Sequence, residues 1–358
     1  MMKGAMSVDL SLYTYLKNSQ RVPIVRLTMR KDETIIRCPF CGDSTKSDQH
    51  AHLFIHNEPP YKFFCHLCES SGYGNTLLRR LDLDNPDLIL KINSAYEKMS
   101  SQYNIKFGGS SILSGSKRSF RLFPEKFSEV ELRKIAYFNS RLNVTMSNKD
   151  INLFRYILNL EDFLNHNGFK RENLVAKLSD ADIAYLNENY AMFLTTSGTD
   201  IICRAMTNDL VPKSKFKRYY RLSLTPNLDD ISCYTLKNEI DVSKSVHNIY
   251  LTEGIWDIIG VYYMRNRQMS DSDVYLASNG KGYLKSLQYI TNLGLLNANI
   301  SIYSDSDVKL ADYRRFLQHS LLCKFNNVNI YYNQNYGYKD FGVSKDLINL
   351  SPPEILTL

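Results

Sequence analysis

The sequence predicts a multi-domain α/β protein with a small cysteine-bearing module, a linker and a larger part built on a parallel sheet. Three observations favour this fold class. Two Cys-x-x-Cys pairs, at 38–41 and 65–68, enclose a segment in which apolar and polar residues alternate. Residues 100–119 are rich in serine and glycine, as flexible linkers are. From 248 to 332, apolar runs of strand length alternate with helix-like repeats, which indicates parallel strands joined by helices.

Composition narrows the classes of function. The 358 residues suit two or three domains, and the net charge of +7 coexists with a cluster of acids in the second half of the chain. The basic residues must therefore gather elsewhere, which favours nucleic acid as an acidic partner. The sequence has neither an apolar run long enough to span a membrane nor the core of a signal peptide. We expect a soluble, cytoplasmic protein that does not contact a membrane.

The first module, at residues 1–95, is predicted to be a zinc ribbon. Each Cys-x-x-Cys pair forms a tight turn that directs two thiolates at one ion, and two such turns complete a tetrahedral, structural Zn²⁺ site. The predicted zinc ligands are Cys38, Cys41, Cys65 and Cys68. Residues 51–56 and 61–64 alternate as the strands of a hairpin would. Two alternatives stay open: a rubredoxin-like iron site with the same ligands, and replacement of one cysteine by His50, His52, His56 or His66.

The ribbon has two candidate roles. It either stabilises the fold or binds single-stranded nucleic acid. The candidate side chains for stacking on bases are Phe54, Tyr61, Phe63 and Phe64, beside Lys46 and Lys62. A helical pattern at 75–92 closes the module, and a flexible linker is predicted at 96–119. The linker glycines do not match a phosphate-binding Gly-x-x-x-x-Gly-Lys-Ser/Thr loop. The remaining cysteines are expected to be small buried hydrophobes: Cys203, Cys233 and Cys323.

Residues 120–245 are predicted to form an α+β region. Helices are expected at 128–141 and 149–158, and a β-hairpin at 191–195 and 200–206. After the hairpin, residues 210–221 combine five basic with three aromatic side chains, and no acid occurs between Asp209 and Asp229. Such a stretch suits a groove that follows a nucleic-acid backbone, with aromatic rings as stacking surfaces.

Two clusters of acids lie at the ends of predicted strands. Glu253 ends the first strand and Asp257 follows it in the next helix, whereas Asp305 and Asp307 end a later strand. A further strand at 274–278 lies between the two in sequence. Because the carboxyl ends of parallel strands meet at one edge of a sheet, these side chains should converge. Carboxylates that face each other repel, so we expect Mg²⁺ or Mn²⁺ to be bound between them.

This arrangement of acids resembles the TOPRIM domain of DnaG-type DNA primases. The matching residues are Glu253-Gly254-x-x-Asp257 and, after a later strand, Asp305-x-Asp307. The same domain occurs in topoisomerases, in some nucleases and in recombination mediators.

Two further motifs resemble those of the same primases, in bacteria and in bacteriophages. Cys-Pro-Phe-Cys, a hairpin and Phe-Phe-Cys-x-x-Cys are similar to their amino-terminal zinc domain. Lys339-Asp340 follows the last predicted strand, where the family has a Lys-Asp motif, but Gly342 and Val343 replace the second acid of that motif.

The resemblance implies roles for three sets of residues. The catalytic acids would be Glu253, Asp305 and Asp307, with Glu253 alternatively a general acid–base. Two or more Mg²⁺ or Mn²⁺ ions would be bound by Glu253, Asp257, Asp305, Asp307 and Asp340. Template, primer or nucleoside triphosphate would be held by Arg204, Lys215, Lys217, Arg218, Arg221 and Lys339.

The resemblance also implies a domain order and a function. Residues 120–245 would be the amino-terminal lobe of an RNA polymerase core, 246–345 the TOPRIM domain and 346–358 a carboxyl-terminal tail. The protein would synthesise short RNA primers on single-stranded DNA from ribonucleoside triphosphates, beside a separate replicative helicase. The short tail and the ribbon with four cysteines favour a bacteriophage source. The alternatives are a recombination mediator that only binds DNA, and a TOPRIM nuclease.

Overall fold

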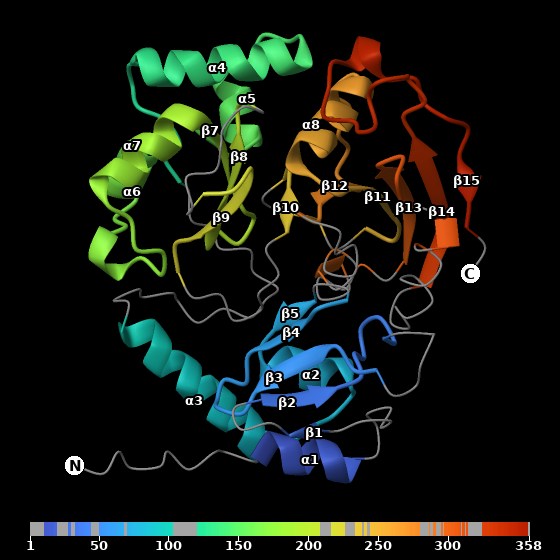
Figure 1. Ribbon diagram of the computed structural model, residues 1–358. Coiled ribbons are helices and arrows are strands. Elements are labelled where there is room, and N and C mark those ends of the chain that lie inside the picture. The colour runs from blue at the N-terminus through green and yellow to red at the C-terminus, as the bar shows by residue number, and fades with distance from the viewer. Residues whose placement is uncertain are drawn as a thin grey trace. The chain divides into compact units, whose positions relative to one another are not determined.

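A computed structural model describes residues 11–19, 28–29, 33–43, 50–67, 70–102, 120–207, 216–225, 233–237, 240–241, 244–279, 297–308 and 324–356, and single positions between 286 and 313. These residues fall into two compact units, one with the residues up to 102 and one with the residues from 120 onward (Figure 1). The described chain is mixed α/β with three β-sheets, in agreement with the predicted fold class.

The amino-terminal unit contains a five-stranded antiparallel sheet in the order β1-β2-β3-β4-β5. Its strands are β1 Thr28–Met29, β2 Glu33–Ile36, β3 Leu53–His56, β4 Phe63–Cys65 and β5 Ser71–Gly72. Alternation along β3 and β4 buries Leu53, Ile55 and Phe63 and places Phe54 and Phe64 on the opposite face. The predicted hairpin is therefore present, as the centre of a larger sheet.

Three described helices accompany this sheet: α1 Ser11–Ser19, α2 Gly74–Arg80 and α3 Pro86–Gln102. The single helical pattern predicted at 75–92 is thus two helices. The chain turns at 81–85, and α3 begins at Pro86, a residue suited to the first helical position. Because α3 continues to Gln102, the prediction that a linker begins at 96 is wrong. Residues 103–119 lie outside the described part.

The second unit contains a four-stranded antiparallel sheet in the order β6-β7-β8-β9. The elements of this part are α4 Glu129–Leu142, α5 Asn148–Leu153, β6 Tyr156–Ile157, α6 Leu160–His166, η1 Arg171–Asn173, α7 Asp180–Asn189, β7 Tyr190–Leu194, β8 Asp200–Ala205 and β9 Tyr219–Ser223. The helix predicted at 128–141 and the hairpin at 191–206 are confirmed. The helix predicted at 149–158 is wrong beyond Leu153, because residues 156–157 pair with β7.

The same unit contains a six-stranded sheet in the order β10-β12-β11-β13-β14-β15. Its elements are β10 Tyr234–Thr235, β11 His247–Thr252, α8 Ile255–Met264, β12 Asp273–Ala277, β13 Asn297–Ser304, β14 Lys324–Tyr332, η2 Lys345–Leu347 and β15 Glu354–Ile355. The four central strands run parallel, as predicted, and the two outer strands run antiparallel to them. Thr252 at the end of β11 pairs with Tyr303 of β13, so the carboxyl ends of these strands lie side by side (Figure 1).

One hydrophobic core joins both sheets of the second unit. Trp256 of α8 packs against Phe138 of α4 and Phe193 of β7, with ring centroids 5.1 and 5.2 Å apart. An ion pair of 2.5 Å between Arg267 and Asp150 adds a polar link between α5 and the end of α8. The regions 120–245 and 246–345 therefore share one core and pack as a single compact unit.

Candidate functional site

Three cysteines of the amino-terminal unit form a candidate metal site. The sulfur atoms of Cys38, Cys41 and Cys65 lie within 4.8 Å of one another, and all three side chains are buried. Cys38 and Cys41 belong to a turn closed by a 3.0 Å hydrogen bond from the Gly42 amide to the Cys38 carbonyl oxygen. Three thiolates at this separation can hold a tetrahedral ion such as zinc. Cys68, the fourth predicted ligand, lies outside the described residues.

A buried carboxylate, Asp43, organises this turn. It accepts hydrogen bonds from the backbone amides of Cys38 at 3.1 Å and His52 at 2.8 Å, and it pairs with the His52 ring. The His52 Nδ1 atom is therefore engaged by Asp43. The other histidines considered as alternative ligands are exposed: His50, His56 and His66. Within the described chain, no histidine joins the group of cysteines.

The ribbon divides its aromatic side chains between two faces. Tyr61 and Phe63 are buried and fill the core of the ribbon, so their rings are not available for stacking on nucleic acid. Phe54 and Phe64 pair across β3 and β4 on the other face. The His66 ring packs edge-on against both of these rings, with centroids 4.9 and 5.0 Å away. The candidate stacking surface of the ribbon therefore consists of Phe54, Phe64 and His66.

The first acidic cluster lies where β11 turns into α8. Glu253 and Gly254 form the turn, and Asp257 lies in the first turn of the helix, where its Oδ2 accepts a 3.1 Å hydrogen bond from the Gly254 amide. This contact satisfies an amide at the start of the helix and places negative charge at the positive end of its dipole. Burial, and then the charges of Asp340 and Asp305, raise the pKa of Asp257 well above its ordinary value.

The second acidic cluster follows β13. Burial raises the pKa of Asp305, although the Lys339 ammonium opposes this shift. Lys339 Nζ lies 3.2 Å from an Asp305 oxygen and 3.6 Å from an Asp307 oxygen. The Ser306 amide also donates a 3.1 Å hydrogen bond to the Lys339 carbonyl oxygen. The segment with the Lys-Asp motif is thus joined to the acids of β13.

The predicted metal-binding acids lie in one region, although within the described chain no three of them bring oxygen atoms within 4.8 Å of one another. The pKa of Asp257 responds to the charges of Glu253, Asp305 and Asp340, which places four of the five carboxylates in one region. Among the described residues, only the cysteine group brings three candidate ligand atoms within 4.8 Å of one another. The raised pKa values follow from desolvated and crowded negative charge, which a cation would relieve.

Several buried donors make no hydrogen bond to any residue that the structure describes. Within the described part of the chain, these donors include Arg204 Nη1, Arg141 Nε and the indole Nε1 of Trp256. Arg204 is 7% exposed, and its guanidinium lies 3.9 Å from the centre of the Tyr219 ring. Arg141 lies over the Trp256 ring at 4.9 Å. A buried donor without a hydrogen bond lowers the stability of the folded state, so the presence of several in one region requires an explanation.

The pKa shifts link these donors to the acids. Burial lowers the pKa of Arg204, and the nearby charges of Arg218 and Arg141 lower it further. The charge of Arg141 in turn holds down the pKa of Asp257, which burial raises. The guanidinium groups of Arg204, Arg218 and Arg141 therefore lie near one another, and that of Arg141 lies near Asp257. Planar guanidinium groups with free donors suit an anion with several oxygen atoms, such as a phosphate group.

Gly342 leaves room for the approach of Arg141 to Asp257. A Cβ atom at position 342 would lie 2.8 Å from the Trp256 Cβ, 3.0 Å from an Asp257 oxygen and 3.3 Å from Arg141 Nη2. An acid at this position would therefore have to displace one of these groups.

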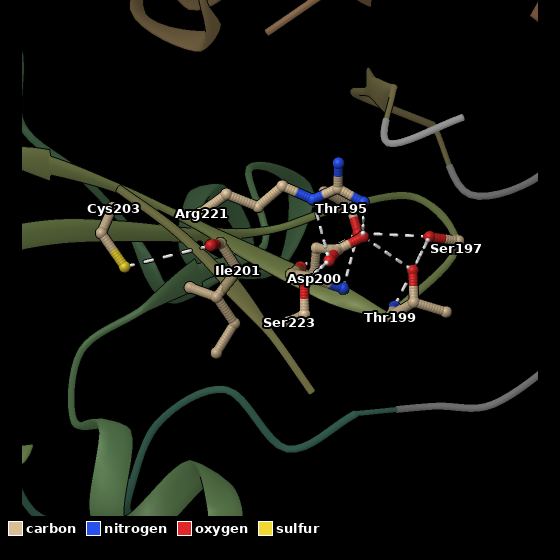
Figure 2. Close-up of polar contacts among 8 residues, drawn as sticks. All are labelled: Thr195, Ser197, Thr199, Asp200, Ile201, Cys203, Arg221 and Ser223. Atoms are coloured by element: carbon tan, nitrogen blue, oxygen red, sulfur yellow. Dashed lines mark hydrogen bonds and ion pairs between the residues drawn. The ribbon is translucent and has the colours of Figure 1, made fainter. Parts of the chain in front are cut away.

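Arg221, a predicted nucleic-acid contact, is held by the fold. Its Nε and Nη2 atoms donate to the two oxygens of buried Asp200, both at 3.0 Å, and Ser223 Oγ donates to the same carboxylate at 2.8 Å (Figure 2). The remaining guanidinium nitrogen points away from Asp200 (Figure 2). Arg221 thus links strands β8 and β9 through Asp200, and its contact with nucleic acid stays a prediction.

The other basic candidates differ in exposure. Lys62, Lys217 and Arg218 are exposed, and the Lys339 side chain is 59% exposed despite its two carboxylate partners. Lys46 and Lys215 lie outside the described residues, as does Cys323. Cys203 and Cys233 are buried, as predicted.

Two residues of this region were not found by sequence reasoning. Arg141 lies at the end of α4 and has no fixed spacing to the acids, so no sequence signal pointed to it. Trp256 is the single tryptophan of the chain and lies between Gly254 and Asp257. Because the only tryptophan of the sequence lies within the acidic motif, the sequence could have indicated that Trp256 belongs to this region.

Comparison with known protein families, with curated protein sequences and with solved structures finds no match to this chain. No helix in the described residues is both long enough and apolar enough to cross a membrane.

Proposed function

We propose that this protein is a DNA primase, which joins ribonucleotides into short RNA primers on a single-stranded DNA template. The observation that carries the proposal is the position of Arg141, whose Nε has no hydrogen-bond partner among the described residues, near crowded carboxylates that follow parallel strands. Nucleotidyl transfer needs both kinds of group, because carboxylates hold divalent cations and fixed positive charge holds a triphosphate. A separate replicative helicase is the proposed protein partner.

In the proposed reaction, the 3′ hydroxyl oxygen of the primer bonds to the α-phosphorus of the incoming nucleotide. The bond from that phosphorus to the bridging oxygen breaks, and pyrophosphate leaves. The hydroxyl proton passes to a base, and Glu253 at the end of β11 is proposed for this role as the alternative to metal binding. Arg141, Arg204 and Arg218 would hold the phosphates. Tyr219 is 61% exposed while it stacks on Arg204, so its outer face is open to a nucleobase.

The donor set of the acidic clusters fits Mg²⁺ or Mn²⁺. Both ions prefer oxygen ligands, and the raised pKa values of Asp257 and Asp305 follow from gathering desolvated carboxylates without enough positive charge. When bound, such an ion neutralises the triphosphate and makes its α-phosphorus easier to attack. The proposed ligands are Glu253, Asp257, Asp305, Asp307 and Asp340.

The variant Asp257→Asn tests metal binding without a measurement of activity. Its amide oxygen can still accept the Gly254 hydrogen bond, but the charge is removed. Because the folded state raises the pKa of this carboxyl, stability falls as pH rises through that pKa. In metal-free buffer at neutral pH, the variant should therefore unfold at a higher temperature than the wild type. Mg²⁺ should raise the unfolding temperature of the wild type much more than that of the variant, and an equal shift would remove Asp257 from the ligand set.

The amino-terminal unit is proposed to bind the template strand. Phe54, Phe64 and His66 form an outward-facing aromatic surface, and aromatic rings stack on bases of any sequence. A structural zinc ion at the cysteine group would hold the strands that carry these rings. The double variant Phe54→Ala with Phe64→Ala should weaken binding of single-stranded DNA, because it removes both rings from the surface.

Primer synthesis tests the proposed function directly. The protein mixed with single-stranded DNA, labelled ribonucleoside triphosphates and Mg²⁺ or Mn²⁺ should make short RNA. Asp305→Ala and Asp307→Ala should abolish synthesis and leave DNA binding intact. Glu188→Ala, which removes an exposed carboxylate on α7, is the matched control and should keep full activity. DNA binding without synthesis would favour a recombination mediator, and DNA cleavage without nucleotides would favour a nuclease.

A further inference from the structure

A short loop beside the acidic clusters carries two exposed tyrosines. The loop, residues 334–339, follows β14. Tyr336 is fully exposed, at 101%, and Tyr338 is 39% exposed. Gly337 between them has a φ angle of +93°, which glycine adopts without strain. A single exposed aromatic ring is common on protein surfaces and indicates nothing alone, so the setting of the ring decides.

The base of this loop is fixed by the buried amide of Asn333. Its Nδ2 donates to the carbonyl oxygens of Asp340 at 3.1 Å and Leu347 at 3.3 Å. Its Oδ1 accepts from the backbone amides of Asn335 at 3.1 Å and Asn349 at 3.0 Å. Both donor hydrogens and both acceptor positions of the amide are thus used. These four hydrogen bonds fix the backbone at the base of the loop. A ligand that stacks on the loop therefore loses less binding free energy to ordering of the chain.

The far end of the loop is tied to the acids. The Ser306 amide donates to the Lys339 carbonyl oxygen at 3.1 Å, and Lys339 Nζ lies 3.2 Å from an Asp305 oxygen. The loop itself contains no acid before Asp340. The loop that carries the exposed ring therefore ends at a lysine that contacts the carboxylates. Negative charge on an approaching strand meets no acidic side chain within the loop.

We propose that Tyr336 stacks on a nucleobase of the single-stranded DNA that enters the proposed active site. This inference rests on the proposed function for its ligand class and adds a contact outside the acids and the guanidinium groups. Every base has a π-face, so the contact would add affinity without sequence preference. Because the loop is joined to Ser306 at Lys339, a base on Tyr336 would set the position of the strand relative to the acids. Tyr336 is thus a positioning residue.

The test compares variants that remove the ring with one that keeps it. Tyr336→Ala removes the ring, Tyr336→Phe keeps it, and Leu132→Ala trims a side chain that is 54% exposed on α4 as a matched control. Binding is measured by fluorescence anisotropy with a labelled single strand of mixed sequence. Tyr336→Ala should weaken binding about tenfold, as loss of one base stack does, whereas Tyr336→Phe and Leu132→Ala should bind like the wild type. Circular dichroism checks that all three variants are folded.

A crosslink locates the contact. Ultraviolet irradiation with a strand that carries 5-iodouracil should join DNA to the peptide that contains Tyr336, and the Tyr336→Ala protein should lack this adduct. An unchanged strand affinity in Tyr336→Ala, or a crosslink that persists in it, would overturn the inference. A loss of affinity for ATP alone, with strand affinity unchanged, would also overturn it, because the ring would then serve the nucleotide.

These outcomes are separate from those of primer synthesis. If the wild type makes no RNA but Tyr336→Ala still loses strand affinity, the proposed function fails and the contact stands. If the wild type makes RNA and Tyr336→Ala binds and synthesises normally, only the contact fails.

Discussion

At the scale of single residues, the protein buries charged groups that the described residues do not fully neutralise. Arg204 is 7% exposed, and neither its Nη1 nor the buried Nε of Arg141 has a hydrogen-bond partner in the part of the chain that the structure describes. Asp257 has a raised pKa because burial and neighbouring acids both oppose its charge. Groups of this kind lower stability, and binding sites are where a protein retains them, since a ligand supplies the missing partner.

Arg141→Ala tests the proposed triphosphate contact. Loss of a guanidinium that binds phosphate should raise the KM for ribonucleoside triphosphates about tenfold, in line with the ~1.5–3 kcal/mol of a hydrogen bond to a charged group. Template affinity should change little. Arg133→Ala on the same helix is the control, because its side chain is 47% exposed and pairs with Glu188 at 3.6 Å. Equal effects of the two variants on nucleotide binding would count against the assignment.

Lys134 gives a pH-dependent prediction. The side chain is fully buried, and burial lowers its pKa to about 7. Its Nζ donates a 3.4 Å hydrogen bond to Asn187 Oδ1. Between pH 7 and its unfolded pKa near 10.4, the unfolded chain holds a proton here that the folded protein lacks. The free energy of unfolding should therefore fall as pH is lowered through this range, by up to about 1.4 kcal/mol per pH unit.

Lys134→Met should remove this dependence. Denaturant titrations from pH 7 to pH 10 should show a flatter stability profile for the variant and a more stable protein at pH 7. Lys149→Met, which changes an exposed lysine in the same unit, should leave the wild-type slope unchanged. If the stability of the wild type did not rise with pH between pH 7 and pH 10, the folded protein would stabilise the Lys134 ammonium, and the pKa of Lys134 would not be lowered.

At the scale of elements, close packing of α8 against the 341–343 segment sets the position of Asp340. A Cβ atom at Gly260 would lie only 1.9 Å from the Phe341 carbonyl oxygen. That atom belongs to the backbone and cannot rotate away as a side chain can. Glycine at this helical position is therefore required by the close approach of the chain, despite its low helix propensity.

Gly260→Ala should consequently separate α8 from this segment. We expect a loss of about 1–3 kcal/mol in the free energy of unfolding, as for other overpacked sites, and weaker Mg²⁺ binding because Asp340 moves with Phe341. Chemical denaturation and Mg²⁺-dependent thermal shifts would measure the two effects. Ser140→Ala, on an exposed position of α4, should change neither quantity. A stable variant with normal Mg²⁺ response would show that the segment can shift without consequence.

At the scale of the whole molecule, two units with separate cores are expected to unfold separately. The described residues up to 102 and those from 120 form distinct compact units. The first is small and has a buried cysteine cluster, and small domains often depend on a metal for stability. The second has an extensive core that joins its two sheets.

Removal of the metal should therefore affect only one unfolding transition. A chelator, or Cys38→Ser, should lower or abolish the calorimetric transition of the amino-terminal unit and release zinc to a colorimetric dye, while the second transition stays in place. Cys203→Ala, in the core of the second unit, should shift only the other transition. A single transition that moves with both variants would contradict the independence of the two units.

The sequence alone determined the local features of this protein. Cysteine spacing indicated the ribbon and its metal, because two ligands held by one tight turn need no distant partner. Strand and helix periodicity indicated the parallel sheet, and the rule that strand ends meet at one edge placed Glu253 near Asp305. The end of α3 and strand β6 were misjudged, because tertiary packing extends or ends such short elements and local propensity does not.

Only the tertiary structure decided which distant groups meet. Arg141 lies near Asp257 because its guanidinium packs over the Trp256 ring and because Gly342 has no side chain, and nothing in the spacing of these residues specifies this proximity. Pairing with buried Asp200 likewise gave Arg221 a structural role between two strands of the sheet. Periodicity records which face of an element is apolar, whereas the partner of that face depends on how separate elements fit together.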